Sequence, residues 1–242
     1  MGEDARPVGA LVTGEAARWP DGRDLVGKTV RLERLDTVRH EPALWAEMAG
    51  QNRLWDYLFE GPPADRAAFT GFLESYTARE DWVGYAICQP DGRARGYAFY
   101  LAIKPDMRSI EVGNINFAPA LQRSVAATEA MFLMMQEVFA LGFRRYEWKC
   151  NALNRPSRRA AQRLGFSWEG VFRQHMIVKG RNRDTAWFGM TDQDWPAVRA
   201  GFTTWLAPDN FDGAGEQRQA LSVLTAPARV ASDPTSTSAH AG

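Results

Sequence analysis

One stretch of the chain runs from an apolar strand directly into a long helix, an arrangement that can bind anions. Residues 110–117 are strand-like, and residues 119–124 (Pro-Ala-Leu-Gln-Arg-Ser) lead from them into the helix. The first turn of a helix leaves backbone N–H groups unpaired and carries a positive partial charge, so phosphate-like groups bind there. Gln122, Arg123 and Ser124 add side-chain donors at the same place. On this pattern alone, an ordinary strand-to-helix turn with a polar cap is the simpler interpretation.

A second stretch of interest begins just after a short apolar strand. Asn154 is placed to cap the following helix, and Pro156 falls in the first turn, where its missing N–H costs nothing. Ser157 begins the exposed face, and Arg158 and Arg159 make that face basic. Taken alone, this is a well-capped amphipathic helix with a solvated basic side.

Together the two stretches resemble the GNAT acetyltransferases, specifically the group that acetylates ribosomal-protein N-termini. The most specific match is Asn-Arg-Pro-Ser at 154–157 followed by Gln-Arg-Leu-Gly-Phe at 162–166, with further matches at 110–113 and 128–130. The resemblance covers roughly residues 27–195. It implies an α+β fold with α/β/α layers, in which a mixed, mostly antiparallel sheet is splayed at its fourth and fifth strands and flanked by helices. It also implies acetyl-CoA as cosubstrate, no metal, and a homodimer as a common assembly.

In that family the pantetheine arm of the cofactor slots between two splayed strands, which here would be 110–117 and 146–150. The resemblance places Asn154 on this arm, Ser157 near the sulfur, and the adenosine phosphates near Arg123 and Arg158. Arg159 is as well explained by a solvated basic face as by a phosphate contact. The cofactor-binding residues expected on this basis are Asn116, Phe117, Gln122, Arg123, Ser124, Val125, Ala126, Ala127, Asn154, Ser157 and Arg158.

The phosphate-binding turn departs from the family pattern at one position. The family has Gln/Arg-x-x-Gly-x-Gly/Ala, whereas residues 122–127 read Gln-Arg-Ser-Val-Ala-Ala, so Val125 takes the usual glycine position. Glycine lets the backbone approach a phosphate closely. Valine is therefore expected to narrow the turn and weaken cofactor binding without removing the N–H groups. The stretch 113–122 also looks one residue longer than usual, which a β-bulge would absorb.

The implied reaction is attack of a neutral amine on a thioester carbonyl. At pH 7, neutralising an α-amine costs about 1 kcal/mol and neutralising a lysine ammonium costs about 4.6 kcal/mol, so an α-amine needs only a modest base. Glu111 is the first candidate base, with a strand-edge ion pair as its equally weighted alternative, and His175 is the second candidate. Ser157 is the candidate hydrogen-bond or proton donor to the departing thiolate. A backbone N–H near Asn116 or Phe117 would stabilise the oxyanion.

The acceptor side is expected in the first half of the chain, where aromatic residues gather: Trp45, Trp55, Tyr57, Phe59 and Trp82. Some of them belong to the core, and a groove of this type suits a peptide end, an amino sugar or an aromatic amine equally well. We expect acetyl transfer to a primary amine, foremost a protein or peptide N-terminal α-amine, by direct attack in a ternary complex. The alternatives are a small-molecule amine such as an amino sugar, polyamine or antibiotic, or a non-catalytic acyl-CoA-binding or RNA-binding module.

Hydrophobic spacing predicts elements in the order β-α-α-β-β-β-α-β-α-β-β. An antiparallel meander followed by a βαβ crossover excludes a simple doubly wound sheet. The expected strands are Val30–Leu35, Trp82–Gln89, Tyr97–Ile103, Ser109–Phe117, Tyr146–Cys150, Ser167–Val178 and Asp184–Met190, and the expected helices are Ala43–Ala49, one capped by Asp65, Val125–Leu141, Pro156–Leu164 and one from about Asp194 to Leu206.

Composition points to a cytoplasmic protein of ordinary globular type. Of the 242 residues, 45% are hydrophobic and 24% charged, and 29 basic residues balance 29 acidic ones. A zero net charge argues against strong nucleic-acid binding, although Arg144, Arg145 and the arginines of 155–163 form a local basic patch. Two cysteines in apolar runs favour neither a disulfide framework nor a cysteine-based zinc site. Neither a membrane-spanning run nor an export pattern is evident.

The two ends of the chain differ in composition from its middle. Residues 1–26 are rich in Gly, Ala, Pro and Arg, which predicts an extended arm, with Trp19 as its expected anchor. Residues 27–212 form the expected acetyltransferase domain. From about Gly213 to residue 242, small and polar residues dominate, which predicts a flexible tail because too little apolar surface is available to offset ordering entropy.

Overall fold

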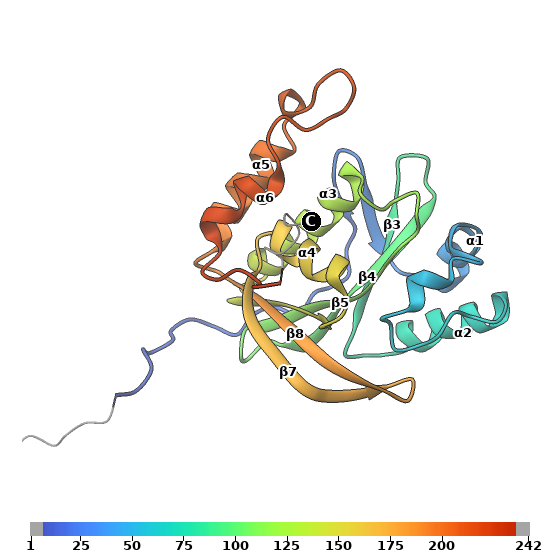
Figure 1. Cartoon of the computed structure of the whole chain (residues 1–242), viewed down its shortest axis with the longest axis horizontal. Helices are drawn as coiled ribbons and strands as arrows, with labels where there is room; N and C mark the ends of the chain where they lie inside the picture. Colours follow the sequence, from blue (N-terminus) through green and yellow to red (C-terminus); the bar gives the residue numbers. More distant parts are fainter. Residues whose placement is uncertain (1–6, 236–242) are drawn as a thin grey trace, which may run out of the picture.

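The computed structural model describes residues 7–235, which form an eight-stranded sheet covered by helices on both faces (Figure 1). The strands are β1 (Leu25–Val26), β2 (Arg31–Arg34), β3 (Val83–Cys88), β4 (Ala94–Lys104), β5 (Ser109–Phe117), β6 (Arg145–Asn151), β7 (Ser167–Val178) and β8 (Arg181–Thr191). The helices are α1 (Thr37–Met48), α2 (Arg66–Thr77), α3 (Val125–Ala140), α4 (Arg155–Arg163), α5 (Trp195–Trp205) and α6 (Leu221–Leu224), with 3₁₀ turns at Asn52–Trp55, Pro208–Asn210 and Ala226–Ala228.

The sheet order is β1-β2-β3-β4-β5-β6-β8-β7, and every neighbouring pair is antiparallel except β5 with β6. The single parallel pair follows from the α3 crossover, since a parallel neighbour requires a long connection. The element order and the mixed, mostly antiparallel sheet confirm the predicted fold class. Strand β1 and helix α6 were not predicted, because a two-residue strand and a single helical turn carry almost no periodic signal.

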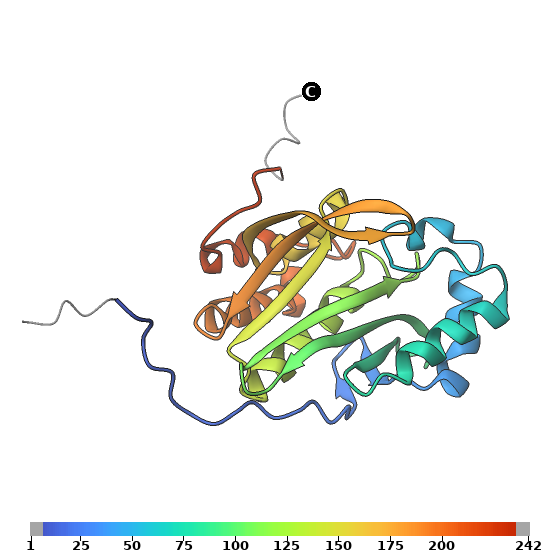
Figure 2. The ribbon, with the colours of Figure 1, turned by 90° about the horizontal axis from the view of Figure 1, so that it is seen from below.

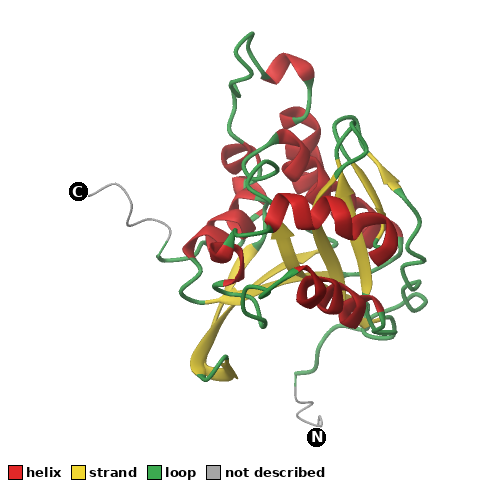
Figure 3. Cartoon of the chain, turned by 90° about the vertical axis from the view of Figure 1, so that its right-hand side faces the viewer, coloured by secondary structure: helices red, strands yellow, loops and turns green. Residues whose placement is uncertain are grey.

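Two separate cores hold the layers together. On one face, α1 and α2 pack on β3 and β4 through a cluster that includes Leu44, Phe69 and Phe99. On the other face, α3, α4 and α5 cover the centre of the sheet in a larger cluster that includes Met134 and Phe188. Figure 3 shows α1 and α2 in front of the sheet, on the face opposite α3.

Helix α1 begins earlier than predicted. The apolar pattern suggested Ala43–Ala49, whereas the helix starts at Thr37 because Asp36 caps it, with its carboxylate accepting from the Arg39 N–H at 2.8 Å. No helix in the described part of the chain is long and apolar enough to cross a membrane.

The N-terminal arm has no helix or strand from residue 7 to 24. Its anchors are backbone hydrogen bonds from the Ala17 N–H to the Pro105 carbonyl at 3.1 Å and from the Arg18 N–H to the Leu141 carbonyl at 2.9 Å. Trp19, the expected anchor, is exposed. Residues 1–6 of the predicted arm lie outside the described residues.

The C-terminal segment differs from its prediction as a flexible tail from Gly213. Leu221 and Thr225 are fully buried, and the Trp168 N–H donates to the Ala231 carbonyl at 3.1 Å. Asp233 is also fully buried, in an ion pair with Arg158. A segment with few large apolar residues is therefore fixed mainly by hydrogen bonds and one buried ion pair, which its composition does not reveal. Residues 236–242 of the predicted tail lie outside the described residues.

Candidate active site

Strands β5 and β6 run together and then separate. They pair from Ser109↔Arg145 to Val112↔Trp148, after which β5 continues to Phe117 along β4 and β6 continues to Asn151 along β8. Figure 2 shows β5 in green and β6 in yellow diverging toward one end of the sheet. We call the separated ends, residues 113–117 and 149–151, the fork. Their facing backbone groups are not paired with each other, so an extended ligand could pair with both.

A β-bulge lies in the β5 arm of the fork. Tyr97 pairs with Asn116 and Phe99 with Gly113, so β5 has one residue more than β4 between these pairs, and Asn114 takes a left-handed φ of 48°. This confirms the bulge expected from the extra residue in 113–122. The Asn116 side chain is buried and its amide donates to the Tyr97 hydroxyl at 3.2 Å. Only the backbone of Asn116 and Phe117 is thus suited to bind a ligand in the fork.

The turn before α3 is held by its own side chains. The Gln122 amide donates to the Phe117 carbonyl at 2.8 Å, and the Ser124 hydroxyl donates to the Leu121 carbonyl at 2.6 Å. Ser124 also caps α3 by accepting from the Ala127 N–H at 3.0 Å. Both side chains therefore shape the turn, and a phosphate would be met by N–H groups of the helix start and by the exposed Arg123.

Val125 occupies the first helical residue of α3. The strained position of the turn is Arg123, with φ of 58°, whereas Val125 has ordinary helical geometry. Its side chain packs partly buried against the large core. The conformational freedom of glycine is therefore not needed at residue 125 in this chain.

Helix α4 begins beside the β6 arm of the fork. The Asn154 side chain accepts from the Ser157 N–H at 3.1 Å, which confirms it as the helix cap. The Ser157 hydroxyl accepts from the Trp148 indole N–H at 3.0 Å and lies beside the buried Cys150 thiol, whose pKa is raised by burial. Trp148 thus holds the Ser157 hydroxyl against the fork.

Arg158, expected near the phosphates, is instead engaged by the C-terminal segment. Its guanidinium makes two 2.6 Å contacts with the Asp233 carboxylate and donates to the Ala152 carbonyl at 2.7 Å. With 8% of its surface exposed, it is committed to the C-terminal segment. Arg159 and Arg123 are both exposed, so their guanidinium groups are more accessible to a phosphate than that of Arg158. The sequence suggested a phosphate contact because the partner Asp233 lies 75 residues further along the chain.

Glu111 lies on the α1/α2 face, opposite Leu101 on β4. Its carboxylate contacts the Lys149 ammonium at 2.8 Å, and Lys149 also contacts Glu147 at 2.9 Å. Burial raises the pKa of Glu111, and the positive charge of Lys149 opposes the rise. Glu111 is therefore in an ion pair, as one of the two interpretations held, although its partner is a lysine.

His175, the second candidate base, shares this face. Its Nδ1 lies 2.9 Å from the Thr185 hydroxyl, and its ring lies near Trp187, whose own ring carries the Lys149 ammonium 4.2 Å from its centroid. Glu111 and His175 are thus two ends of one chain of contacts along the sheet face. The side chain of His175 is exposed at the edge strand β7.

Contacts across the site join the loop between α1 and α2 to the β7–β8 hairpin. The Lys179 ammonium donates to the backbone carbonyls of Trp55 at 2.7 Å and of Asp56 and Glu60 at 3.3 Å. The Tyr57 hydroxyl donates to the Leu153 carbonyl at 3.3 Å. Figure 2 shows the orange hairpin tip beside the blue loop. The acceptor side is therefore bounded by three segments far apart in sequence.

The aromatic residues expected on the acceptor side divide into two groups. Trp55 is buried, and Trp45 and Trp82 pack against Phe69 and Tyr76, so these three belong to the core beneath α1 and α2. Tyr57 and Phe59 are exposed at the loop. Only these two remain available to an acceptor.

Several polar residues of this side were missed at the sequence level. The Tyr76 hydroxyl donates to the Glu60 carboxylate, and burial raises the pKa of Tyr76 well above its ordinary value, with Tyr97 and Glu60 adding to the rise. The Asn114 side chain lies beside Tyr76 and partly offsets this rise. Arg183 is buried on β8. These residues come from α2, β5 and β8, and no motif links them.

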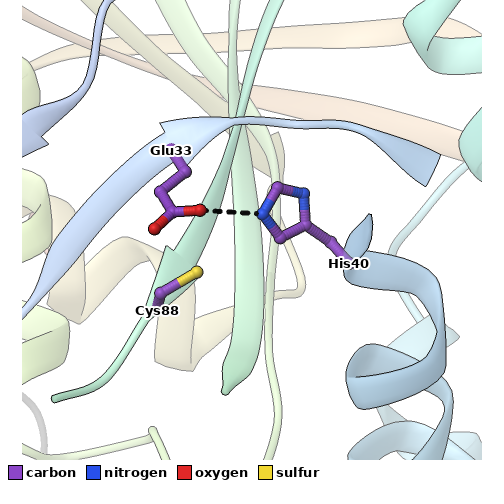
Figure 4. Close-up of side chains that lie close together, drawn as sticks. All are labelled: Glu33, His40 and Cys88. Atoms are coloured by element: carbon purple, nitrogen blue, oxygen red, sulfur yellow. Dashed lines mark hydrogen bonds and ion pairs between the residues drawn. The ribbon is translucent and has the colours of Figure 1, made fainter. Parts of the chain in front are cut away.

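Glu33, His40 and Cys88 bring three ligand-type atoms within 4.8 Å of one another away from the fork, all buried (Figure 4). Glu33 contacts the His40 ring at 3.2 Å and the Arg39 guanidinium at 2.7 Å. Burial raises the pKa of the Cys88 thiol to about 12, whereas metal ligands are thiolates. The Glu33–His40 contact joins β2 to α1, and Cys88 packs beside it in the smaller core.

Comparison with known proteins gives a consistent family. Residues 30–167 match the model of the acetyltransferase (GNAT) domain. A GCN5-related N-acetyltransferase from Brucella melitensis is 43% identical, with a TM-score of 0.85 over 88% of this chain and 98% of that chain. A GNAT-family acetyltransferase from Chromobacterium violaceum is 38% identical, with a TM-score of 0.75 over 81% and 100%.

A more distant structure is the ribosomal L7/L12 α-N-protein acetyltransferase RimL with coenzyme A disulfide-linked to a cysteine. It is 20% identical, with a TM-score of 0.60 over 70% of this chain and 98% of that chain, and shows likeness of fold alone. No curated protein matches the chain. With its fork, its α3 turn and the family match, the chain belongs to the GNAT acetyltransferases, enzymes that use acetyl-CoA as acetyl donor.

Proposed function

We propose that the protein transfers the acetyl group of acetyl-CoA to the N-terminal α-amine of a protein or peptide by direct attack in a ternary complex. The observation that supports this most strongly is the fork. Pairing between β5 and β6 ends at Val112↔Trp148, so an extended cofactor arm entering from the α3/α4 face can reach an acceptor on the α1/α2 face. The two substrates would meet between the faces, which suits direct transfer.

On the cofactor side, the proposal uses mainly backbone groups. The N–H groups that begin α3, with Arg123 beside them, would bind the phosphates. Residues 113–117 and 149–151 would pair with the pantetheine arm. The Ser157 hydroxyl, held by Trp148, would hydrogen-bond the sulfur and help the thiolate to leave. A backbone N–H of residues 116–117 would stabilise the oxyanion.

On the acceptor side, Glu111 is the proposed base. The raised pKa of Glu111 is closer to the pKa of an α-amine, which improves proton transfer from the amine at neutral pH. The cost of neutralising an α-amine at pH 7 is only about 1 kcal/mol, so a paired carboxylate acting through a water suffices. A lysine side chain would require about 4.6 kcal/mol, which favours α-amines as acceptors.

The first experiment is calorimetry of the protein with acetyl-CoA. We expect micromolar binding that is lost in the double variant Asn154→Ala, Ser157→Ala and retained in the control Arg155→Ala, which changes an exposed neighbour on the same helix. An absence of binding in the unsubstituted protein would refute the proposal at its first step.

The second experiment measures release of coenzyme A with matched acceptors. One peptide has a free α-amine and no lysine, a second has a blocked α-amine and one lysine, and the small amines are an amino sugar and a polyamine. At pH 7 we expect turnover with the first peptide and with none of the other acceptors. Faster turnover of a small amine than of that peptide would mean that the acceptor is a small molecule. Turnover of the lysine peptide alone would contradict the choice of an α-amine.

A further inference from the structure

Arg183 is a buried cation in the acceptor side of the site with no carboxylate of its own. It lies on β8, and only 8% of its surface is exposed. Among residues 7–235 it makes no ion pair, and its one hydrogen bond runs from Nε to the Thr185 hydroxyl at 3.3 Å. A guanidinium that is largely removed from water, and whose one hydrogen bond within these residues is to a hydroxyl, is well suited to bind an anionic ligand.

The surroundings of Arg183 place it at the fork. Thr185, two residues further along β8, pairs with Asn151 at the end of the β6 arm, so Arg183 lies just beyond that arm and on the same face as Thr185. Glu111 makes its direct ion pair with Lys149 at 2.8 Å, and its attraction for Arg183 acts without a hydrogen bond between the two side chains. Burial lowers the pKa of Arg183, and the negative charge of Glu111 opposes part of that fall.

The contacts of the guanidinium leave its two terminal nitrogens without a hydrogen-bond partner among the described residues. The Phe59 ring lies over the group, with its centroid 5.0 Å from Cζ, in a cation–π contact. Thr185 accepts from Nε. The two terminal nitrogens make no hydrogen bond within residues 7–235, and the N–H groups on that edge of a guanidinium can bind a carboxylate through two parallel hydrogen bonds.

We infer that Arg183 binds a carboxylate carried by the acceptor close to its reacting amine. This rests on the proposed acetyl transfer and names the acceptor class within it: peptides with an acidic residue next to the N-terminus, or amino acids whose own carboxylate lies near the amine. Cationic acceptors such as polyamines are disfavoured, since a second positive charge would be buried beside Arg183. A bound carboxylate also fixes the acceptor while Glu111 receives the proton.

The test compares acceptors that differ only in this charge. Coenzyme A release is measured with peptides beginning Ser-Glu and Ser-Gln, with free glutamate, and with its α-carboxamide. We expect kcat/KM to be at least tenfold higher for the acidic member of a pair. Preference within the peptide pair but not the amino-acid pair identifies a peptide acceptor, and the reverse identifies a small molecule.

Variants separate Arg183 from general effects. Arg183→Gln is expected to abolish the preference by raising KM for the acidic acceptor at least tenfold, with acetyl-CoA affinity within twofold of the unsubstituted protein. Arg183→Lys retains the positive charge and should keep part of the preference. It is the variant to use if Arg183→Gln folds poorly. The control is Arg181→Gln, an exposed arginine on the same strand, which should change neither value.

Two outcomes would overturn the inference in distinguishable ways. Equal turnover of acidic and amide acceptors, or a preference that survives in Arg183→Gln, would refute the role of Arg183 and leave acetyl transfer intact. Turnover of none of the amines, despite measurable acetyl-CoA binding, would refute the proposed function and this inference with it.

Discussion

The two faces that meet at the fork are built from different kinds of groups. The α3/α4 face offers backbone N–H groups, a helix start and one hydroxyl, all positioned by strand pairing and helix caps. The α1/α2 face offers charged and aromatic side chains from the α1–α2 loop, β5, β6 and the β7–β8 hairpin. A site made of backbone follows from the fold and tolerates substitution. A site made of side chains depends on the identity of each residue, so the α1/α2 face determines which acceptor binds.

The largest expected effect is on the side-chain face. Glu111→Gln should lower kcat/KM by roughly 10²–10⁴-fold, the usual contribution of a general base. Since the carboxylate form is active and burial raises its pKa, the rate of the unsubstituted enzyme should rise with pH through that raised pKa and again as the amine deprotonates. Steady-state rates across pH should show the lower step disappear in the variant.

Glu147→Gln is the matched control for that experiment. Glu147 shares Lys149 with Glu111 and lies directly opposite Glu111 on the neighbouring strand β6. If Glu147→Gln matched the loss and kept the same pH profile as Glu111→Gln, the ion-pair network and not a base would be responsible.

A second effect concerns the link between the C-terminal segment and the cofactor face. Asp233→Ala leaves Arg158 buried without its partner, which should lower the free energy of unfolding by about 3–5 kcal/mol. Because Arg158 also holds the Ala152 carbonyl just before Asn154, KM for acetyl-CoA should rise more than KM for the acceptor. Thermal unfolding and steady-state kinetics measure both. Asp209→Ala, which removes an exposed carboxylate elsewhere in the C-terminal region, should change neither.

The two helix caps allow a direct comparison of the faces. Asn154 caps α4 and Asp65 caps α2, each accepting from the N–H three residues later. Replacing either by alanine should cost about 1 kcal/mol of stability. Only Asn154→Ala should also weaken acetyl-CoA binding in calorimetry. Equal binding by both variants would show that Asn154 acts solely as a cap.

The smallest effect is expected at the departure from the family pattern. Val125→Gly should change the dissociation constant of acetyl-CoA less than threefold, since Val125 already has helical geometry and its N–H is present. A gain of tenfold or more, measured in the same calorimeter, would mean that the valine side chain does obstruct the phosphates.

The sequence is informative about these two faces to different degrees. Asn154 was recognisable as a cap because its partner lies three residues away, and the β5 bulge because the strand has one extra residue, whereas Ser124 was expected only as a donor at the turn. Arg183 and Lys179 were not recognisable, since their meaning comes from Phe59 and the α1–α2 loop, over 100 residues distant. Arg158 was misread for the same reason. Caps and bulges depend on residues close together in the sequence and can be predicted from it, whereas contacts between distant segments cannot.

The order of strands has a consequence for biosynthesis. Strand β8 inserts between β6 and β7, so the outer edge of β6 stays unpaired until Arg181–Thr191 has left the ribosome. The β5 arm of the fork can form with β4 much earlier, as a local hairpin. The nascent chain therefore exposes an unsatisfied sheet edge late in synthesis, and truncation before residue 191 should yield an aggregation-prone product even though residues 30–167 already match the family domain.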